Sequence, residues 1–366
     1  MKIIFIGGTR PDWLKLYPLV EAMRKDDYFD LTLISTEQGK DFSRQVFEHL
    51  GFQPDIKLDC MREKQTMDSF LKIAVPAISS ILADNRPDFL LVQGDTMTAL
   101  AGAIAAKYQN LKLIHLEAGI RSFNLSNPYP EEMIRYIIDH FSDVLFTTTD
   151  FTENNLAREH IIANVFRVGN TIVDMFKKQR IKKAKSTGRK RILVTVHRRD
   201  NFGLPLMRVC SAIRILAMKY SDEIEFIIPV HLNPNISETI HQKLNGFSNI
   251  VLRPPLDYWE FLSILKSSYL VITDSGGLCE EAPSFSIPVL ILRELTDRQE
   301  SVKLGFARIV GTSVSSIIDN VMELLTDKDK YLKMKATWNP YGDGTASKRI
   351  IEILKGKFKW NNFGLI

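Results

Sequence analysis

Short apolar runs alternate with longer stretches of helical periodicity along the sequence, and this alternation limits the possible folds more than any other feature. The run at 3–6 is followed by a predicted helix that opens at Pro11. Proline suits the first helical turn, because the N–H that it lacks would have no partner there. Apolar residues then recur at helical spacing and should face the core: Trp13, Leu16, Val20 and Met23.

Nine further apolar runs are candidates for buried strands. They are LTLIS (31–35), FLLVQ (89–93), KLIHL (112–116), DVLFT (143–147), ILVTV (192–196), EFIIPV (225–230), NIVL (249–252), YLVIT (269–273) and VLIL (289–292). Strands that alternate with helices predict parallel sheets covered on both faces. The pattern restarts near Gly169-Asn170, after which a helix over 172–186 should end in a basic linker. We therefore expect an α/β protein of two doubly wound domains facing a cleft.

The composition is that of an ordinary globular protein. The chain has 366 residues, enough for about two domains, and its net charge is only +5. The positive charge is spread along the chain, so we expect no nucleic-acid partner and interpret the basic linker as a solvated surface. A mildly basic protein suits a small anionic substrate such as a phosphate ester.

Cysteines and apolar runs indicate the expected location. Cys60, Cys210 and Cys279 lie far apart, which argues against a disulfide framework or a structural zinc site. The sequence has no secretory signal pattern and no apolar run approaching the roughly 18 residues of a membrane span. We expect a cytoplasmic protein that does not associate with membranes.

Polar residues follow several predicted strands, and ligands of open α/β sheets bind beyond the carboxyl ends of the strands. In the first half these residues include Asp95, Glu117 and, at the start of a helix, Glu131. In the second half they include His197-Arg198-Arg199 and Asp274-Ser275-Gly276-Gly277. This division predicts acid–base chemistry in the first half and a diphosphate held mainly by the second, where glycines precede a helix N-terminus.

Each of these residues also has a purely structural interpretation. Asp95 could cap a helix, and Glu131 could serve the helix dipole. The glycine turn could exist for packing, and His115 lies inside an apolar strand and is expected to be a core histidine. The sequence lacks the G-x-G-x-x-G, Walker A, H-E-x-x-H and G-x-S-x-G motifs, so nicotinamide, ATP, zinc and serine-hydrolase chemistry lose their usual signatures.

Taken together, these motifs resemble the non-hydrolysing UDP-N-acetylglucosamine 2-epimerases nearly from end to end. Any one motif is modest, but their order and spacing are specific. The matching segments are GGTRPDWLK (7–15), GDT (94–96), HLEAGIR (115–121), PEE (130–132), GNTIVD (169–174), VTVHRRDNFG (194–203), PVHLNPN (229–235), TDSGGLCEEAPS (273–284), LRELTDR (292–298) and NPYGDG (339–344).

The resemblance implies a glycosyltransferase-B-like fold with two Rossmann-like domains. The first would comprise 1–169, with a C-terminal helix over 345–366 packing back on it, and the second, UDP-binding domain would comprise 170–344. The implied activity is interconversion of UDP-GlcNAc and UDP-ManNAc through a 2-acetamidoglucal, by a homodimer that needs neither a metal nor another cofactor.

The resemblance also assigns residues of the site. Its catalytic positions match Asp95, Glu117, Glu131 and His197. Its substrate- and UDP-binding positions match Arg10, Lys15, Gln65, Glu117, Arg135, His197, Phe261, Ser275, Gly276, Gly277, Glu281 and Arg298.

The chain departs from the family pattern at several positions. Asp12 stands where glutamate is usual, Ile134 where asparagine is common and Gln299 where proline is common. Family members that need UDP-GlcNAc as an activator hold it partly through a Gln-His pair and an Arg-Gln pair. These pairs match Gln38-Gly39 and Lys64-Gln65 here, and His231 matches another contact. The departures predict weak activation.

The sequence leaves alternative functions open. Related epimerases act on UDP-2,3-diacetamido uronic acids or on UDP-N-acetyl-6-deoxy sugars. A glycosyltransferase of the same fold, a hydrolysing epimerase and an inactive nucleotide-sugar sensor are further candidates, because fold alone does not fix function.

Overall fold

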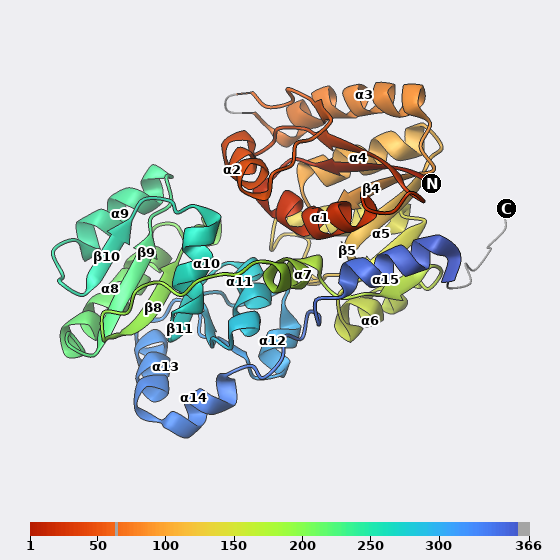
Figure 1. Cartoon of the computed structure of the whole chain (residues 1–366). Coiled ribbons are helices and arrows are strands. Elements are labelled where there is room, and N and C mark those ends of the chain that lie inside the picture. Colours follow the sequence, from red (N-terminus) through yellow and green to blue (C-terminus); the bar gives the residue numbers. More distant parts are fainter. Residues whose placement is uncertain (63–64, 358–366) are drawn as a thin grey trace. The chain divides into compact units, whose positions relative to one another are not determined.

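The computed structural model describes residues 1–62 and 65–357 and divides the chain into two compact units (Figure 1). The first unit comprises Met1–Gln179 and the chain from Tyr341 onward, and the second comprises Arg180–Pro340. Residues 170–179 and 341–344, which we expected in the second domain, therefore belong to the first unit. Residues 358–366 of the expected C-terminal helix lie outside the described residues.

The first unit contains a seven-stranded parallel sheet with the strand order β3-β2-β1-β4-β5-β6-β7. Helices α3, α4 and α5 pack on one face of this sheet, and α1 packs with α2, α7 and α15 on the other (Figure 1). The strands are β1 (Lys2–Gly7), β2 (Asp30–Ser35), β3 (Ile56–Lys57), β4 (Phe89–Gln93), β5 (Lys112–Ala118), β6 (Val144–Thr147) and β7 (Val165–Arg167). The helices are α1 (Arg10–Met23), α2 (Lys40–Leu50), α3 (Met67–Asn85), α4 (Met97–Tyr108), α5 (Glu131–Phe141), α6 (Asp150–Arg158), α7 (Thr171–Lys178) and α15 (Ala346–Glu352), which a π-helical turn at Ile353–Lys357 extends.

The second unit contains a six-stranded parallel sheet with the order β10-β9-β8-β11-β12-β13. Its largest core cluster lies between the sheet and helices α8, α9 and α13. The strands are β8 (Lys190–Thr195), β9 (Ile224–Pro229), β10 (Ile250–Arg253), β11 (Leu270–Thr273), β12 (Val289–Ile291) and β13 (Ala307–Ile309). The α-helices are α8 (Leu204–Lys219), α9 (Pro234–Leu244), α10 (Tyr258–Lys266), α11 (Gly276–Glu281), α12 (Gln299–Lys303), α13 (Val314–Thr326) and α14 (Lys328–Met334), and short 3₁₀ turns lie at Arg199–Asn201 and Ala282–Phe285.

Both sheets confirm the predicted fold class of doubly wound parallel sheets. Each has the strand order 3-2-1-4-5-6 of the Rossmann fold, in which the order reverses between the first and fourth strands. Each predicted apolar run coincides with a strand, because strands buried on both faces consist almost wholly of apolar residues. The predicted core residues Trp13, Leu16, Val20 and Met23 are at most 1% exposed.

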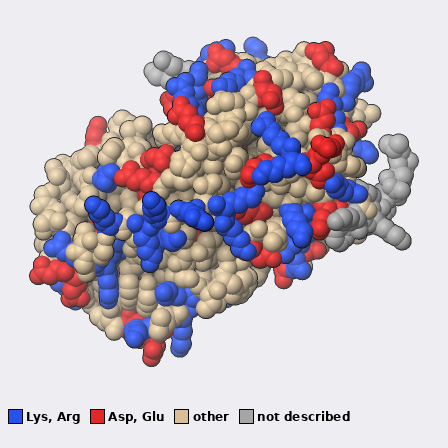
Figure 2. Space-filling view, viewed as in Figure 1, with Lys and Arg blue, Asp and Glu red and all other residues tan. Residues whose placement is uncertain are grey.

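The predicted helix over 172–186 was wrong in its extent. Helix α7 ends at Lys178, and the following basic residues are exposed. Beyond α7 the backbone bonds to the second unit instead of continuing the helix: Ala184 N–H donates to the Ser263 carbonyl, and Lys266 Nζ donates to the Ile181 carbonyl. Like charges at helical spacing also disfavour a helix here. Figure 2 shows lysines and arginines along this segment, consistent with the expected solvated surface.

Two motifs far apart in the sequence meet where the chain leaves and re-enters the first unit. Asn170 N–H donates to the Tyr341 carbonyl at 2.6 Å. Gly169 has a φ of +94°, and a Cβ there would lie 3.3 Å from Gly342 Cα. Asp174 is 3% exposed, and its carboxylate accepts the N–H groups of Ala346 and Ser347 at the start of α15. The GNTIVD motif therefore anchors the returning chain.

The Asp174 carboxylate should determine how firmly α15 is held. In Asp174→Ala, two buried N–H groups lose their acceptor, which costs about 1–3 kcal/mol for a buried unsatisfied group. We expect the amides of Ala346 and Ser347 to exchange with solvent about 5- to 150-fold faster, as measured by hydrogen–deuterium exchange. The control is Asp222→Ala, whose side chain is 96% exposed. Unchanged exchange in Asp174→Ala would contradict this role.

Candidate active site

Each sheet has one position where the strand order reverses, and ligands of open α/β sheets bind there. We call the carboxyl ends of β1, β4 and the neighbouring β5 the first switch point. The carboxyl ends of β8 and β11 form the second switch point. Several of the predicted site residues follow these strands, among them Arg10, Asp95, His197 and Ser275.

The turn after β1 is packed so tightly that only glycine fits. A Cβ at Gly8 would lie 2.1 Å from Thr98 Oγ1 and 2.4 Å from Thr36 Oγ1. Helix α1 begins directly after this turn, with the guanidinium of Arg10 5.2 Å from the centre of the Phe42 ring. The tight turn thereby places the predicted Arg10 and Lys15 at the start of α1, beside the end of β1.

Glu117 interrupts the regular strand geometry of β5. Its φ is +67°, which is uncommon for a residue other than glycine, and the pairing of β5 with β6 shifts register at this point. The side chain is buried, and its Oε1 lies 2.5 Å from both Lys15 Nζ and Asn170 Nδ2. Strained backbone of this kind is retained where the surrounding structure holds it, and it clusters at functional sites.

Asp95 does not cap a helix, so that structural interpretation is wrong. The residue that caps α4 is Thr96, whose hydroxyl accepts the Ala99 N–H at 3.2 Å. Asp95 instead receives hydrogen bonds from Arg135, with Oδ2 2.8 Å from Nε and 2.5 Å from Nη2. The predicted Arg135 therefore fixes the Asp95 carboxylate at the end of β4.

The two adjacent glutamates of the PEE motif have different surroundings. Glu132 is fully buried, and it accepts the N–H groups of Ser122 and Phe123 at 2.8 Å and pairs with Arg135. Glu131 Oε2 is also buried but has no hydrogen-bond partner among the described residues. A buried polar atom without a partner needs an explanation, and a bound ligand or water supplies one. Glu132 is thus structural, and Glu131 has the character of a site residue.

His115 is confirmed as a core histidine, and it supports the first switch point through the Gly94 carbonyl. It is 0% exposed, and its Nδ1 lies 2.6 Å from Asp139 Oδ1 while Nε2 lies 2.9 Å from the Gly94 carbonyl oxygen. Asp139 also pairs with Arg121 at 2.7 Å and accepts the Gly119 N–H. Burial alone would raise the pKa of Asp139, but His115 and Arg121 more than offset this and hold it below its usual value.

The second switch point is organised by one buried carboxylate. Asp274 is 0% exposed and follows β11. It accepts the backbone N–H groups of His197 and Arg198, which follow β8, at 3.0 and 2.9 Å. It also accepts an N–H of the Asn201 side chain at 2.9 Å and lies 3.3 Å from His197 Nδ1. Asp274 therefore joins the two strands on either side of the reversal and orients the His197 ring, whose side chain is 41% exposed.

The two glycines after Ser275 are not explained by packing. Neither has a positive φ, and a Cβ at Gly276 or Gly277 would come no closer than 3.5 Å to other atoms. Other residues would therefore fit both positions within this chain. A ligand that approaches the backbone closely would account for the glycines, as phosphates do at other glycine-rich turns.

Cations surround this glycine turn. Burial and the charge of Arg198 lower the pKa of Arg293. Arg298 is 7% exposed, with Nε 2.5 Å from Glu280 Oε1 and Nη1 3.0 Å from Asp297 Oδ2. Glu281 accepts a hydrogen bond from the Tyr258 hydroxyl, and Phe261 lies on α10, half-buried. Gathered arginines and the first N–H groups of a helix, which have no partner within the helix, suit a diphosphate.

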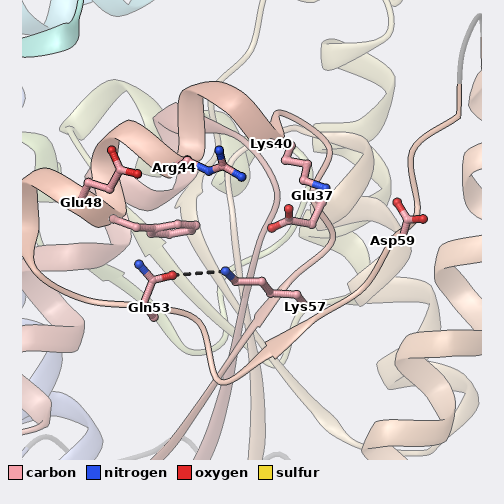
Figure 3. A pocket seen from close by; sticks show the side chains of 8 residues that line it. Glu37, Lys40, Arg44, Glu48, Gln53, Lys57 and Asp59 are labelled. Atoms are coloured by element: carbon pink, nitrogen blue, oxygen red, sulfur yellow. Dashed lines mark hydrogen bonds between the residues drawn. The ribbon is translucent and has the colours of Figure 1, made fainter.

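Gln65 is the predicted residue that the described contacts place elsewhere. Its amide donates to the Cys60 carbonyl and accepts the Arg62 N–H, within the loop before α3. Lys64 lies outside the described residues. A hollow of about 420 Å³ opens beside α2, lined by charges of both signs that include Lys40, Arg44 and Glu48 (Figure 3). None of the predicted site residues lines it.

Several residues that support the site were not predicted. The sequence pattern places Asp274 only in a turn and Asn170 only in a motif.

Within residues 1–62 and 65–357, no cluster of three or more His, Cys, Asp and Glu residues could hold a metal ion, and no helix is long and apolar enough to cross a membrane.

Comparison with known proteins agrees with this geometry. Residues 21–355 match the family model described as UDP-N-acetylglucosamine 2-epimerase. The proteins of that name from Campylobacter jejuni and Yersinia pestis are 40% and 38% identical, each alignment covering 97% of this chain and 98% of the relative. The crystal structure of UDP-GlcNAc 2-epimerase from Neisseria meningitidis bound to UDP-GlcNAc has a TM-score of 0.92 at 34% identity, covering 97% of this chain and 100% of that one. The similarity confirms the glycosyltransferase-B-like fold.

Asp12, which stands where the family usually has glutamate, should make stability depend on pH. Burial raises its pKa from 3.8 to about 6, against hydrogen bonds from the Gly8 and Thr9 backbone, and the charge of Asp95 adds to the rise. Because the folded-state pKa is the higher one, the contribution of Asp12 is fully present below pH 3.8 and is lost as the pH rises through about 6.

We therefore expect Asp12→Asn to remove part of this pH dependence. At 1.36 kcal/mol per pH unit between the two pKa values, the part removed is at most about 3 kcal/mol. Urea unfolding of both proteins at pH 4 and pH 7.5 measures it. If the wild type and Asp12→Asn lose the same stability between these pH values, the prediction is wrong.

Proposed function

The chain belongs to the UDP-N-acetylglucosamine 2-epimerase family, and we propose that it interconverts UDP-GlcNAc and UDP-ManNAc by elimination and re-addition of UDP. The observation that carries the proposal is the division of the chemistry between the two units. Three carboxylates, Asp95, Glu117 and Glu131, belong to the first switch point and its adjoining helix. Arginines, His197 and the glycine turn at the N-terminus of α11 gather at the second.

The reaction needs both sets of groups. The hydrogen at C2 of a 2-acetamido sugar is not adjacent to a carbonyl carbon, so direct removal as a proton is difficult. If the C1–O bond breaks as a base takes the C2 proton, the products are UDP and a neutral 2-acetamidoglucal. A proton returned to the opposite face of C2, with re-addition of UDP at C1, completes the inversion. A carboxylate base, an acid for the opposite face and cations for the leaving diphosphate are therefore required.

The first unit supplies the acid–base groups. Glu117 is held through Oε1 by Lys15 and Asn170, and Asp95 is held by Arg135. Glu131 presents a buried oxygen with no partner among the described residues. We assign proton removal and return at C2 to these three carboxylates. One well-placed acid or base contributes about 10²- to 10⁴-fold to the rate.

The second unit supplies the UDP site. We assign the diphosphate to the Ser275-Gly276-Gly277 turn, with Arg298 and the ring of His197 beside it. Preorganised donors of this kind stabilise charge that develops on a leaving group. In this assignment Phe261 and Glu281 contact the nucleoside, and Arg10 of the first unit is a further substrate-binding residue. We also expect a cytoplasmic homodimer, which light scattering of the purified protein would test.

Incubation with UDP-GlcNAc alone, followed by NMR, tests the proposed function. Formation of UDP-ManNAc without added cofactor supports epimerisation. Release of free ManNAc would instead assign the chain to the hydrolysing epimerases, and an unchanged spectrum would overturn the proposal.

Replacing the three carboxylates should separate chemistry from binding. We expect Asp95→Asn, Glu117→Gln and Glu131→Gln each to lower turnover by about 10²-fold or more, because each exchange removes an acid–base group. UDP affinity, measured by calorimetry, should stay close to that of the wild type, since the assigned diphosphate site lies in the second unit. The control is Glu48→Gln, because the Glu48 side chain is exposed. Glu132→Gln is a poor control, because the Glu132 carboxylate is fully buried and is bonded to Ser122, Phe123 and Arg135. Near-normal turnover in all three variants would remove the acid–base assignment.

Activation by UDP-GlcNAc should be weak. Gly39 has no side chain to hold an activator, and the Gln38 side-chain oxygen already accepts hydrogen bonds from the Thr98 N–H and hydroxyl. A lost hydrogen bond to a neutral partner costs about 0.5–1.5 kcal/mol and one to a charged group about 1.5–3 kcal/mol. The loss of histidine at Gly39, together with Lys64 in place of the planar fork of arginine, should therefore weaken activator binding by about tenfold to several hundredfold. We expect the reaction from UDP-ManNAc alone to proceed without added UDP-GlcNAc. A long lag that trace UDP-GlcNAc abolishes would show the opposite.

A further inference from the structure

Asn170 uses both ends of its side-chain amide inside the first unit. Its Oδ1 accepts the Ile172 N–H at 3.0 Å and so caps helix α7. Its Nδ2 donates to Glu117 Oε1 at 2.5 Å. Asn170 is 1% exposed, so both interactions are shielded from water. No other natural side chain of this size offers an acceptor and an N–H donor in one rigid plane.

Both donors described on Glu117 fall on the same carboxylate oxygen. Lys15 Nζ and Asn170 Nδ2 each lie 2.5 Å from Oε1. Oε2 points the other way, 3.6 Å from where a Cβ of Gly94 would be, toward the turn that carries Asp95. The two donors therefore fix the rotation of the carboxylate and direct Oε2 to the end of β4.

We propose that Asn170 is a positioning residue for epimerisation, which holds Glu117 so that Oε2 takes or returns the C2 proton. This inference rests on the proposed function and names a residue that the function did not require. The backbone φ of Glu117, +67°, is not one that glutamate favours, so the surrounding structure must hold this residue in place. The carboxylate also needs contacts of its own to keep one orientation. Lys15 and Asn170 provide that support from two elements, α1 and the start of α7.

The same residue connects Glu117 to the place where the chain leaves and re-enters the first unit. Asn170 N–H donates to the Tyr341 carbonyl, and the neighbouring Gly169 packs against Gly342. The orientation of Glu117 thus depends on both connecting segments, 169–171 and 341–342. In this proposal the GNTIVD motif bears on catalysis through this link, although none of its residues was predicted to contact substrate.

The exchange Asn170→Asp tests the proposal with little change in shape. Aspartate caps helices as well as asparagine does, so the bond to Ile172 N–H is kept. It replaces the amide donor to Glu117 by a carboxylate oxygen, so two negatively charged groups then face each other. Asn170→Ser is a second variant, because serine also caps helices but its shorter side chain does not reach Glu117. Asn164→Asp is the matched control, since that amide donates to the Asp143 carbonyl, away from Glu117.

We expect Asn170→Asp to lower kcat by about 10²-fold or more and Asn170→Ser by at least tenfold, because a small misplacement of a reacting group costs about 10²-fold. KM and UDP affinity should change less than threefold. The primary isotope effect on kcat with substrate deuterated at C2 should increase, because proton transfer becomes slower relative to other steps. A purely structural defect lowers the amount of active enzyme but leaves this isotope effect unchanged.

The outcomes separate the inference from the function on which it rests. If the wild type epimerises and either variant keeps its kcat, Asn170 does not position Glu117. The inference also fails if kcat falls in a variant with no rise in the isotope effect, or falls equally in Asn164→Asp. If the wild type does not epimerise at all, the proposed function itself has failed. A lower kcat together with a larger isotope effect supports the inference that Asn170 positions Glu117. If Asn170→Asp does not fold, Asn170→Ser alone provides this test.

Discussion

Buried carboxylates hold together the loops that carry the chemistry, and the rest of the site depends on them. Asp139 joins His115, Arg121 and the Gly119 backbone beneath the first switch point. Asp274 joins the backbone after β8 to the end of β11 at the second. A buried charge is stable only when it is paired and hydrogen-bonded, so each carboxylate forces its neighbours into one arrangement.

The two units apply the same fold to different tasks. Both sheets reverse their strand order in the same way, so both create a crevice at the carboxyl ends of their strands. The first sheet ends in held carboxylates, whereas the second ends in cations and a glycine turn that neither packing nor backbone conformation requires. In the proposed mechanism, proton transfer and leaving-group stabilisation can therefore be altered independently by residues in different units.

The sequence predicts the central strands of both sheets but misses most of the edge strands. Strands buried on both faces consist of apolar runs, so each central strand was predicted. Three of the four edge strands, β3, β7 and β13, have at most three residues and lack such a run, whereas the fourth, β10, was predicted. The helix predicted to reach 186 ends at Lys178, because the following backbone finds its partners in the second unit, which local sequence does not encode. Type and spacing predict Asp95, Glu117 and Glu131 as site residues, but only the structure distinguishes Glu131 from Glu132, whose carboxylate is bonded to Ser122, Phe123 and Arg135. Asn170 was not predicted as a site residue either, because its role depends on a contact with Glu117, which lies 53 residues away in the sequence.

In the proposed mechanism the C1–O bond breaks as C2 exchanges its proton. A single incubation in D₂O, with UDP-GlcNAc labelled with ¹⁸O in the bond between C1 and the diphosphate, tests both events. We expect deuterium at C2 of UDP-ManNAc and migration of the label from the bridging to the non-bridging β-phosphate positions, both followed by NMR. Product that retains its original C2 hydrogen, or a label that stays in the bridge, would contradict it.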